Sequence, residues 1–269
     1  MKTETRAYVN IVALAAVLLF NYLSNALPLN NFTQQDISFD LYPVLLTPAG
    51  YVFPIWGVIY LLLIAFIVYQ ALPKYRGNPY NNAVGILFAV TSLLNIFWLL
   101  AWHFLQIGLS LVIMAFLLLT LMAVYLRINR QVSRGNIYDM VFVKLSFSLY
   151  LAWICVAILA NLNVFLYDIG WLGVGFGSVL FTILMIIIGA VVALYIFLVR
   201  RDYVFPLVFA WAFIGIAVRH GSELVLLTIV ALTSAVVLLF FVVWFFRSWG
   251  IKNSYLKIVQ TYLNLIANS

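Results

Sequence analysis

Charged residues are scarce in this sequence. Only 8% of its 269 residues are charged, whereas 67% are apolar and 17% are aromatic. A soluble domain carries about 25% charged residues, and no polar stretch here is long enough to bury a core of its own. The composition therefore predicts an all-α, polytopic membrane protein, a helical bundle in the lipid bilayer, and excludes a soluble domain.

Cysteine and histidine are also scarce. The single Cys155 excludes an internal disulfide and any multi-cysteine metal site. His103 and His220 are expected at the outer surface, at the same depth as Asp168 and Glu223, where such groups could bind a metal or a haem iron. They have no ligand spacing in the sequence, so polar helix ends are the favoured interpretation and no metal ligand is assigned.

The common catalytic motifs are missing as well. The sequence has no nucleophile motif, no glycine-rich phosphate loop and no pair of buried carboxylates. We therefore expect no catalytic residue and no enzymatic activity. Oxidation chemistry of Trp and Tyr on a bound porphyrin leaves no spacing signature, so that alternative stays open.

The apolar runs predict eight transmembrane helices. Their ranges are 7–27, 51–72, 82–103, 109–126, 140–161, one within 171–199, 203–218 and 223–246. The seventh run is short, about 24 Å of helix at 1.5 Å per residue. Ser24-Asn25-Ala26 resembles a signal-peptidase site, but the length of the first run and its polar Asn21 favour a retained helix.

The positive charge follows the expected topology. With both termini cytoplasmic, all but one of the 14 Lys and Arg residues lie on the inner side, and only Arg219 is outside. The net charge of +7 therefore reflects membrane orientation and does not indicate a nucleic-acid partner. We expect the plasma (inner) membrane of a bacterium, with residues 247–269 as an interfacial amphipathic tail; a solvated tail is the alternative.

The stretch from Pro48 to Tyr60 joins a long polar loop to the second helix. Pro54 stands in the first helical turn, where its missing N–H costs little. Phe53, Trp56 and Tyr60 recur at i, i+3 and i+7, so they share one helix face. This face is either an interfacial aromatic anchor or the wall of a binding pocket.

The third helix repeats this spacing with Asn95, Trp98 and Trp102. A buried carboxamide needs a partner in the membrane. An interhelical hydrogen bond is the simpler interpretation of Asn95, and a polar contact in an aromatic pocket is the functional one.

The fifth helix carries a third pattern of the same kind. Tyr150, Trp153, Ala157 and Asn161 fall on one face. They could border a cavity or form a seam of close helix packing, which small residues also favour.

Together these motifs resemble those of the TspO/MBR family, the translocator proteins also called tryptophan-rich sensory proteins. The segment from Pro48 through Phe53-Pro54-Ile-Trp56 to Tyr60 is similar to the family's first motif, roughly P-x-W-x-F-x-P-x-W-x-x-L-Y. Asn95, Trp98 and Trp102 are similar to its third-helix motif, and Tyr150-Leu-Ala-Trp153 with Leu162-Asn163 to its fifth-helix motif. The resemblance covers about residues 7 to 165.

The resemblance implies a five-helix bundle with a ligand pocket beneath the loop of residues 28–50, which would be its lid. Family members bind tetrapyrroles and, in some cases, sterols, and their roles are described as sensing or transport. The resemblance thus implies a membrane receptor or carrier whose ligand is a porphyrin or haem. It implies no resident cofactor, and a homodimer is a further expectation. The implied ligand-binding residues are Pro48, Phe53, Trp56, Tyr60, Asn95, Trp98, Trp102, Tyr150 and Trp153.

The chain also departs from the family pattern. Ala101-Trp102-His103 replaces a common Pro-Pro pair, and no basic residue closely follows Tyr167, so a sterol ligand is not expected. Residues 166–246 add three helices to the expected five-helix unit of residues 1–165. Two alternatives stay open: a transporter of small solutes, or an assembly or regulatory subunit whose added helices bind a partner through Gly173, Gly175, Gly177 and Ser178.

Overall fold

The computed structural model describes the whole chain except residues 1–2, 28, 132–134, 174 and 248–269. The described part is built of helices and loops. Its long helices are α1 (Thr3–Ala26), α3 (Ile55–Ala71), α5 (Leu87–His103), α6 (Ile107–Asn129), α7 (Ser146–Asp168), α8 (Phe176–Arg200), α9 (Val204–His220) and α10 (Val225–Phe245). Two short helices, α2 (Gln34–Asp36) and α4 (Pro79–Val84), lie between them. The all-α bundle predicted from composition is confirmed, and the predicted tail of residues 247–269 lies almost wholly outside the described residues.

The long helices match the predicted membrane spans in position. Among the described residues, six segments are long and apolar enough to cross a membrane, whereas α5 and α9 are apolar helices of 17 residues each. At 1.5 Å per residue each of these two is about 25 Å long, close to the hydrocarbon core of about 30 Å. The short seventh run is an unbroken helix packed against α7, α8 and α10.

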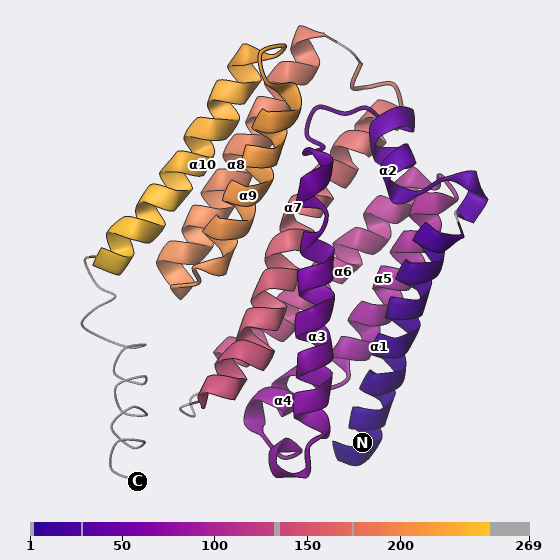
Figure 1. The fold of residues 1–269 in the computed structure, drawn as a ribbon, viewed down its shortest axis with the longest axis vertical. Coiled ribbons are helices and arrows are strands. Elements are labelled where there is room, and N and C mark those ends of the chain that lie inside the picture. The colour runs from indigo at the N-terminus through magenta and orange to yellow at the C-terminus, as the bar shows by residue number, and fades with distance from the viewer. Residues whose placement is uncertain (1–2, 28, 132–134, 174, 248–269) are drawn as a thin grey trace.

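The helices form two groups side by side (Figure 1). In the first, α1 packs on α3 and α5, and α6 packs between α5 and α7. In the second, α9 packs on α8 and α10, and its contact with α7 joins the groups. The predicted boundary after residue 165 falls inside α7, which continues to Asp168. The division into two units stays a prediction.

Two predicted helix limits are wrong. The third run is not one helix from residue 82, because the chain breaks at Gly85, whose φ of 58° favours glycine. The Gly85 carbonyl accepts a hydrogen bond from Asn10 in α1 (3.0 Å). The fifth helix does not end at residue 161, and Asn163, two residues beyond that predicted end, is buried inside α7.

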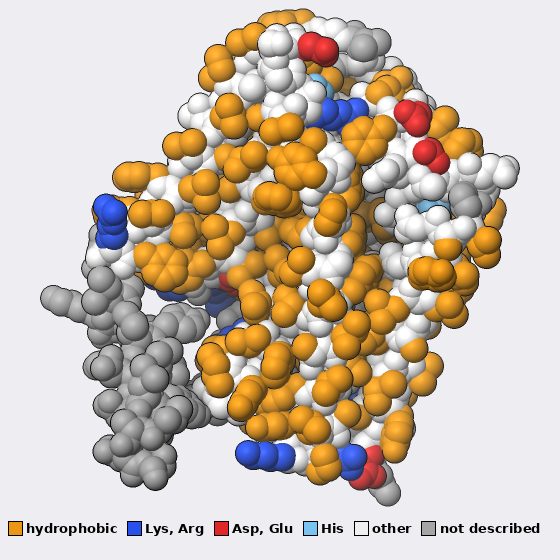
Figure 2. All heavy atoms as spheres, viewed as in Figure 1, with side chains coloured by type: hydrophobic (Ala, Val, Ile, Leu, Met, Phe, Trp, Pro, Cys, Tyr) orange, Lys and Arg blue, Asp and Glu red, His pale blue; other side chains and the backbone are white. Residues whose placement is uncertain are grey.

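Charges gather at the two ends of the bundle. Figure 2 shows Asp, Glu and His side chains at one end of the visible face and most Lys and Arg side chains toward the other. At the basic end Arg76 pairs with Glu4 (3.0 Å), and Arg6 donates to Asn82. This separation agrees with the predicted orientation, with the basic end cytoplasmic.

Candidate functional site

A small cavity lies under the loop between α1 and α3, enclosed by α3, α5, α6 and α7. Its volume is about 70 Å³. Six of the nine residues predicted from sequence line it: Pro48, Phe53, Trp56, Trp98, Trp102 and Trp153. The other lining residues are Gln34, Ser38, Thr47, Met114, Val156, Ala157, Ala160, Asn161 and Val164. Three separate sequence motifs therefore meet at one place.

Aromatic rings at right angles make one wall of the cavity. The turn Gly50–Val52 and Pro54 at the start of α3 direct Phe53 and Trp56 toward α7. Trp153 meets both rings edge to face, with centroids 6.4 Å from Phe53 and 6.3 Å from Trp56. Edge-to-face pairs of this kind add about 0.5–1.5 kcal/mol beyond burial. The wall is thus held in a defined arrangement.

A second wall is held by hydrogen bonds. Trp98 stacks on Trp102 at 5.9 Å, and its indole N–H donates to Asn161 Oδ1 (3.1 Å). The Asn161 amide donates in turn to Ser110 Oγ (3.0 Å). Trp153, Ala157 and Asn161 border the cavity, so this face of α7 is not merely a packing seam. Sequence spacing had left both interpretations open.

One polar group in the cavity wall has no partner. The indole Nε1 of Trp153 is buried and makes no hydrogen bond with any described residue. A buried N–H without an acceptor is destabilising by about 1–3 kcal/mol. An acceptor atom on a bound ligand would remove this cost.

The three remaining predicted residues lie outside the cavity lining. Asn95 accepts from Asn21 in α1 (3.1 Å) and donates to the Tyr150 hydroxyl in α7 (3.2 Å). It therefore makes the interhelical hydrogen bonds that were the simpler interpretation. Tyr60 stacks on the outer side of Trp56 with centroids 5.6 Å apart. Their assignment to ligand binding stays a prediction.

A groove lies on the other side of Trp56. It runs between α1 and α3 beneath α2, with a volume of about 480 Å³. Gln34, Phe53 and Trp56 border both the cavity and the groove. These side chains therefore form the partition between the aromatic cavity and the groove between α1 and α3.

A sequence model of the family described as TSPO-like protein matches residues 7–244. The chain belongs to the TSPO-like protein family. The match contains every residue of the cavity and also α8, α9 and nearly all of α10, so the three added helices are part of the matched region. Searches of curated proteins and of solved structures found no match. The family is generally non-enzymatic.

In this TSPO-like protein the described part of the predicted lid, residues 28–50, is ordered by local hydrogen bonds. Thr33 and Asp36 cap the short helix α2 reciprocally: the Thr33 amide donates to the Asp36 carboxylate (2.7 Å), and the Asp36 amide donates to the Thr33 hydroxyl oxygen (3.2 Å). The amide of Thr33, and to a smaller extent its side chain, lower the pKa of Asp36. Further along, the Tyr42 hydroxyl donates to Asp168 at the end of α7 (2.8 Å). Partial burial and this carboxylate raise the pKa of Tyr42 to about 12.

The same loop is bound to α9, which sequence reasoning did not foresee. Arg219 donates to the Thr47 carbonyl (2.9 Å) and lies over the Phe39 ring at 4.7 Å. His220 Nε2 lies 2.8 Å from the Leu45 carbonyl oxygen, and the Trp211 indole donates to the Val52 carbonyl (3.3 Å). The only sequence signal was that Arg219 is the one basic residue expected outside. The added helices thus hold the loop that covers the cavity.

The two histidines end α5 and α9 as expected, and both side chains are buried within the protein. His103 Nδ1 lies 2.8 Å from the Leu99 carbonyl oxygen. Within the described ranges, no three His, Cys, Asp or Glu side chains lie close enough together to hold a metal ion.

Proposed function

We propose that this TSPO-like membrane protein binds a large, flat, apolar ligand of the tetrapyrrole class in the aromatic cavity, for sensing or transport. The observation that carries the proposal is the meeting of Phe53, Trp56 and Trp153 around a buried, unpartnered indole N–H. Planar macrocycles stack on such rings. A porphyrin carboxylate or carbonyl would supply the acceptor that the Trp153 N–H lacks.

The volume of the cavity implies that binding requires opening. Ligand pockets usually measure about 300–1,000 Å³, several times the cavity volume of about 70 Å³. The groove between α1 and α3, about 480 Å³, begins directly behind Phe53 and Trp56. Rotation of these two side chains would join the two spaces. An apolar ligand would then reach the site laterally from the bilayer, between α1 and α3.

The proposal is for a binding protein without a catalytic step and without a resident cofactor. The sequence features that argue against a sterol still apply, because no basic residue closely follows Tyr167. We further propose that the protein lies in a bacterial plasma membrane, because its Lys and Arg side chains gather at the end predicted to face the cytoplasm. A homodimer remains an expectation. Gly173 and Gly175 precede α8 rather than lying on a helix face, so the glycine pattern gives the partner-binding alternative little support.

Tryptophan fluorescence tests the proposal directly. Protoporphyrin is titrated into the purified protein and into Trp56→Phe, Trp153→Phe and Trp244→Phe variants. Trp244 is the matched control, because it is exposed on α10. We expect saturable quenching, weakened between about twofold and tenfold by either cavity substitution and unchanged by the control. Linear quenching that all variants share would show partitioning into detergent and would refute the proposal.

A further inference from the structure

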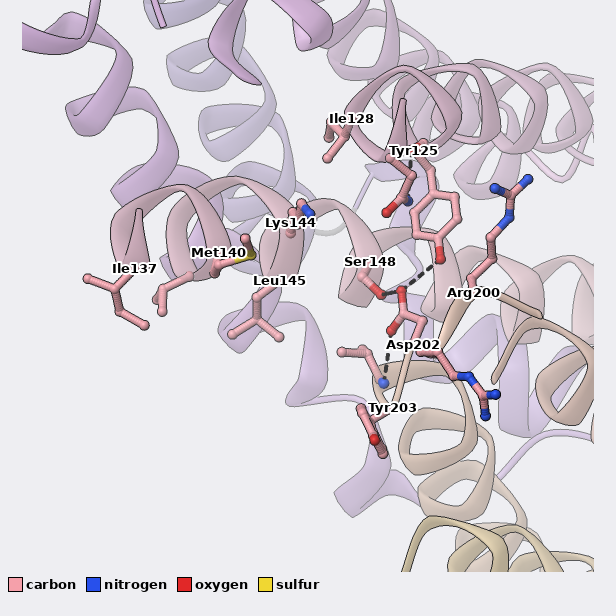
Figure 3. Close-up of a pocket in the computed structure, with 14 residues that line it drawn as sticks. Tyr125, Ile128, Ile137, Met140, Lys144, Leu145, Ser148, Arg200, Asp202 and Tyr203 are labelled. Carbon is pink, nitrogen blue, oxygen red and sulfur yellow. Dashed lines mark hydrogen bonds between the residues drawn. The ribbon is translucent and has the colours of Figure 1, made fainter. Parts of the chain in front are cut away.

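A second pocket, with charged side chains in its wall, lies where α8 turns into α9. Figure 3 shows that its residues come from α6, from residues 137–145 with the start of α7, and from the α8–α9 turn with the helix ends beside it. Its volume is about 320 Å³. Lys144, Arg200 and Arg201 bring three positive charges to it, and Asp202 brings the one negative charge. This pocket is separate from the aromatic cavity and is independent of the function proposed above.

The carboxylate of Asp202 is already occupied. It accepts from the Ser148 hydroxyl (2.6 Å), the Tyr125 hydroxyl (2.9 Å) and the Val204 amide (3.0 Å). These bonds tie α6, α7 and the start of α9 together (Figure 3). The role of Asp202 is therefore structural, and within the described part of the chain it forms no ion pair with Lys144 or Arg200.

Two of the cations have no carboxylate at ion-pair distance among the described residues, although Asp139 and Asp202 attract the charge of Lys144 from farther away. Lys144 is half-buried, and its ammonium lies 5.2 Å from the centre of the Tyr80 ring. Arg200 is exposed at the end of α8. Neither makes an ion pair or a hydrogen bond with the described residues. Arg201 lies over the Phe245 ring at 4.2 Å. The pocket is thus charged to receive an anion.

An apolar groove continues from this pocket along the seam between the two helix groups. Its volume is about 530 Å³, and α6 and α7 line one side and α8 the other. Tyr125 and Arg200 belong to both spaces. Away from Arg200 the groove is bordered by apolar side chains, among them Leu118, Leu151, Ile158 and Ile188, and by Cys155. A charged pocket therefore opens into an apolar groove within the membrane.

We propose that an anionic phospholipid binds here, with its phosphate against Arg200 and Lys144 and an acyl chain in the groove between α7 and α8. Basic pockets between helices on the cytoplasmic side are suited to acidic head groups. A free phosphate ion would interact with the positive charges of Lys144 and Arg200 but would leave the adjoining apolar groove empty. A lipid matches both parts. The bound lipid would fill the seam between the first group of helices and α8.

Native mass spectrometry of the full chain tests the proposal. The detergent-solubilised protein is mixed with phosphatidylglycerol or with phosphatidylcholine of the same acyl chains. We expect phosphatidylglycerol to be retained preferentially. Arg200→Ala and Lys144→Gln should each reduce the preference about fivefold. Arg130→Ala is the control, since Arg130 is an exposed arginine after α6 and lines neither space; it should leave the preference unchanged.

Two neighbouring isoleucines test the acyl groove. Ile188 lines it, whereas Ile187 is exposed on the same helix and does not. Ile188→Trp should abolish retention of phosphatidylglycerol, and Ile187→Trp should not. The lone Cys155 reports the location, because bound phosphatidylglycerol should slow its alkylation by N-ethylmaleimide more than phosphatidylcholine does.

Three results would overturn the proposal. Equal retention of the two lipids would show that the charges do not select a head group. A preference that survives both Arg200→Ala and Lys144→Gln would place the lipid elsewhere. Displacement by inorganic phosphate alone, with no effect of Ile188→Trp, would show a site for a free anion.

Discussion

The carbonyl of Gly215 in α9 accepts a hydrogen bond from the amide of Ala49, with 3.0 Å between the two atoms. The backbones approach so closely that a Cβ built on Gly215 would overlap Val52 and lie 2.9 Å from the Cβ of Pro48. Phe53 and Trp56 follow directly in the chain. The position of the aromatic wall is therefore tied to α9, which makes the added helices part of the cavity's support.

Gly215→Ala should destabilise the protein by pushing this loop away from α9. Overpacking of this kind costs about 1–3 kcal/mol, so we expect a lower melting temperature and weaker quenching by protoporphyrin. Gly177→Ala is the matched control, because nothing lies within 4 Å of its added Cβ. A Gly215→Ala protein as stable as the wild type would contradict the described contact.

The aromatic wall could be predicted because its signal is local. Phe53 and Trp56 recur at helical spacing behind a proline, and such spacing determines which side chains share a face. Apolar runs gave the membrane helices for the same reason. The helix break at Gly85 could not be predicted from the sequence, because glycine is also common inside membrane helices.

The contacts between distant segments could not be predicted in this way. Arg219 and His220 approach carbonyl oxygens of residues 44–47. Every residue has such an oxygen, so no side-chain pattern marks the partner. The role of Asn95 is likewise decided by its hydrogen-bond partners, Asn21 in α1 and Tyr150 in α7. Spacing showed that Asn95 shares a face with Trp98 but not whether that face meets a cavity or another helix.

Asp202→Ala should have opposite effects on stability and on lipid binding. The Asp202 side chain bonds to the Val204 amide at the start of α9 and accepts from Ser148 and Tyr125. Its loss leaves these donors without their acceptor, at about 1–3 kcal/mol. The melting temperature should fall, while the preference for phosphatidylglycerol should rise because the pocket loses its one negative charge.

The control for this experiment is Asp40→Ala. Asp40 is exposed and makes no hydrogen bond with the described residues. Its removal should change neither quantity. A fall in both stability and lipid preference for Asp202→Ala would argue against the proposed electrostatic role of the pocket.

The bond between Tyr42 and Asp168 predicts a stability change at alkaline pH. In the folded protein the pKa of Tyr42 is about 12, above its ordinary value of 10.0. A pKa raised on folding contributes stability below pH 10, and this contribution is lost as the pH rises through about 12. Wild type should therefore be more stable than Tyr42→Phe at pH 8, and the difference should shrink between pH 10 and 12.

Thermal melts of both proteins across this pH range provide the measurement, and Tyr8→Phe is the control. Tyr8 is exposed on α1 and its hydroxyl bonds to no described residue, so this substitution controls for the loss of a phenol oxygen. A constant difference for Tyr42→Phe would show that the phenol contributes no pH-dependent stability.

Trp56→Ala should speed exchange of the ligand if the site is reached between α1 and α3. Trp56 borders both the cavity and the lateral groove, whereas Trp102 borders the cavity alone. Removing the Trp56 ring opens the partition between cavity and groove. Stopped-flow quenching by protoporphyrin should therefore show a higher association rate, and the dissociation rate should rise by a larger factor. Trp102→Ala also removes a cavity ring and should weaken binding, but it leaves the partition intact and should not speed association. Equal acceleration by the two substitutions would mean that the ligand takes another route, such as one beneath the loop held by α9.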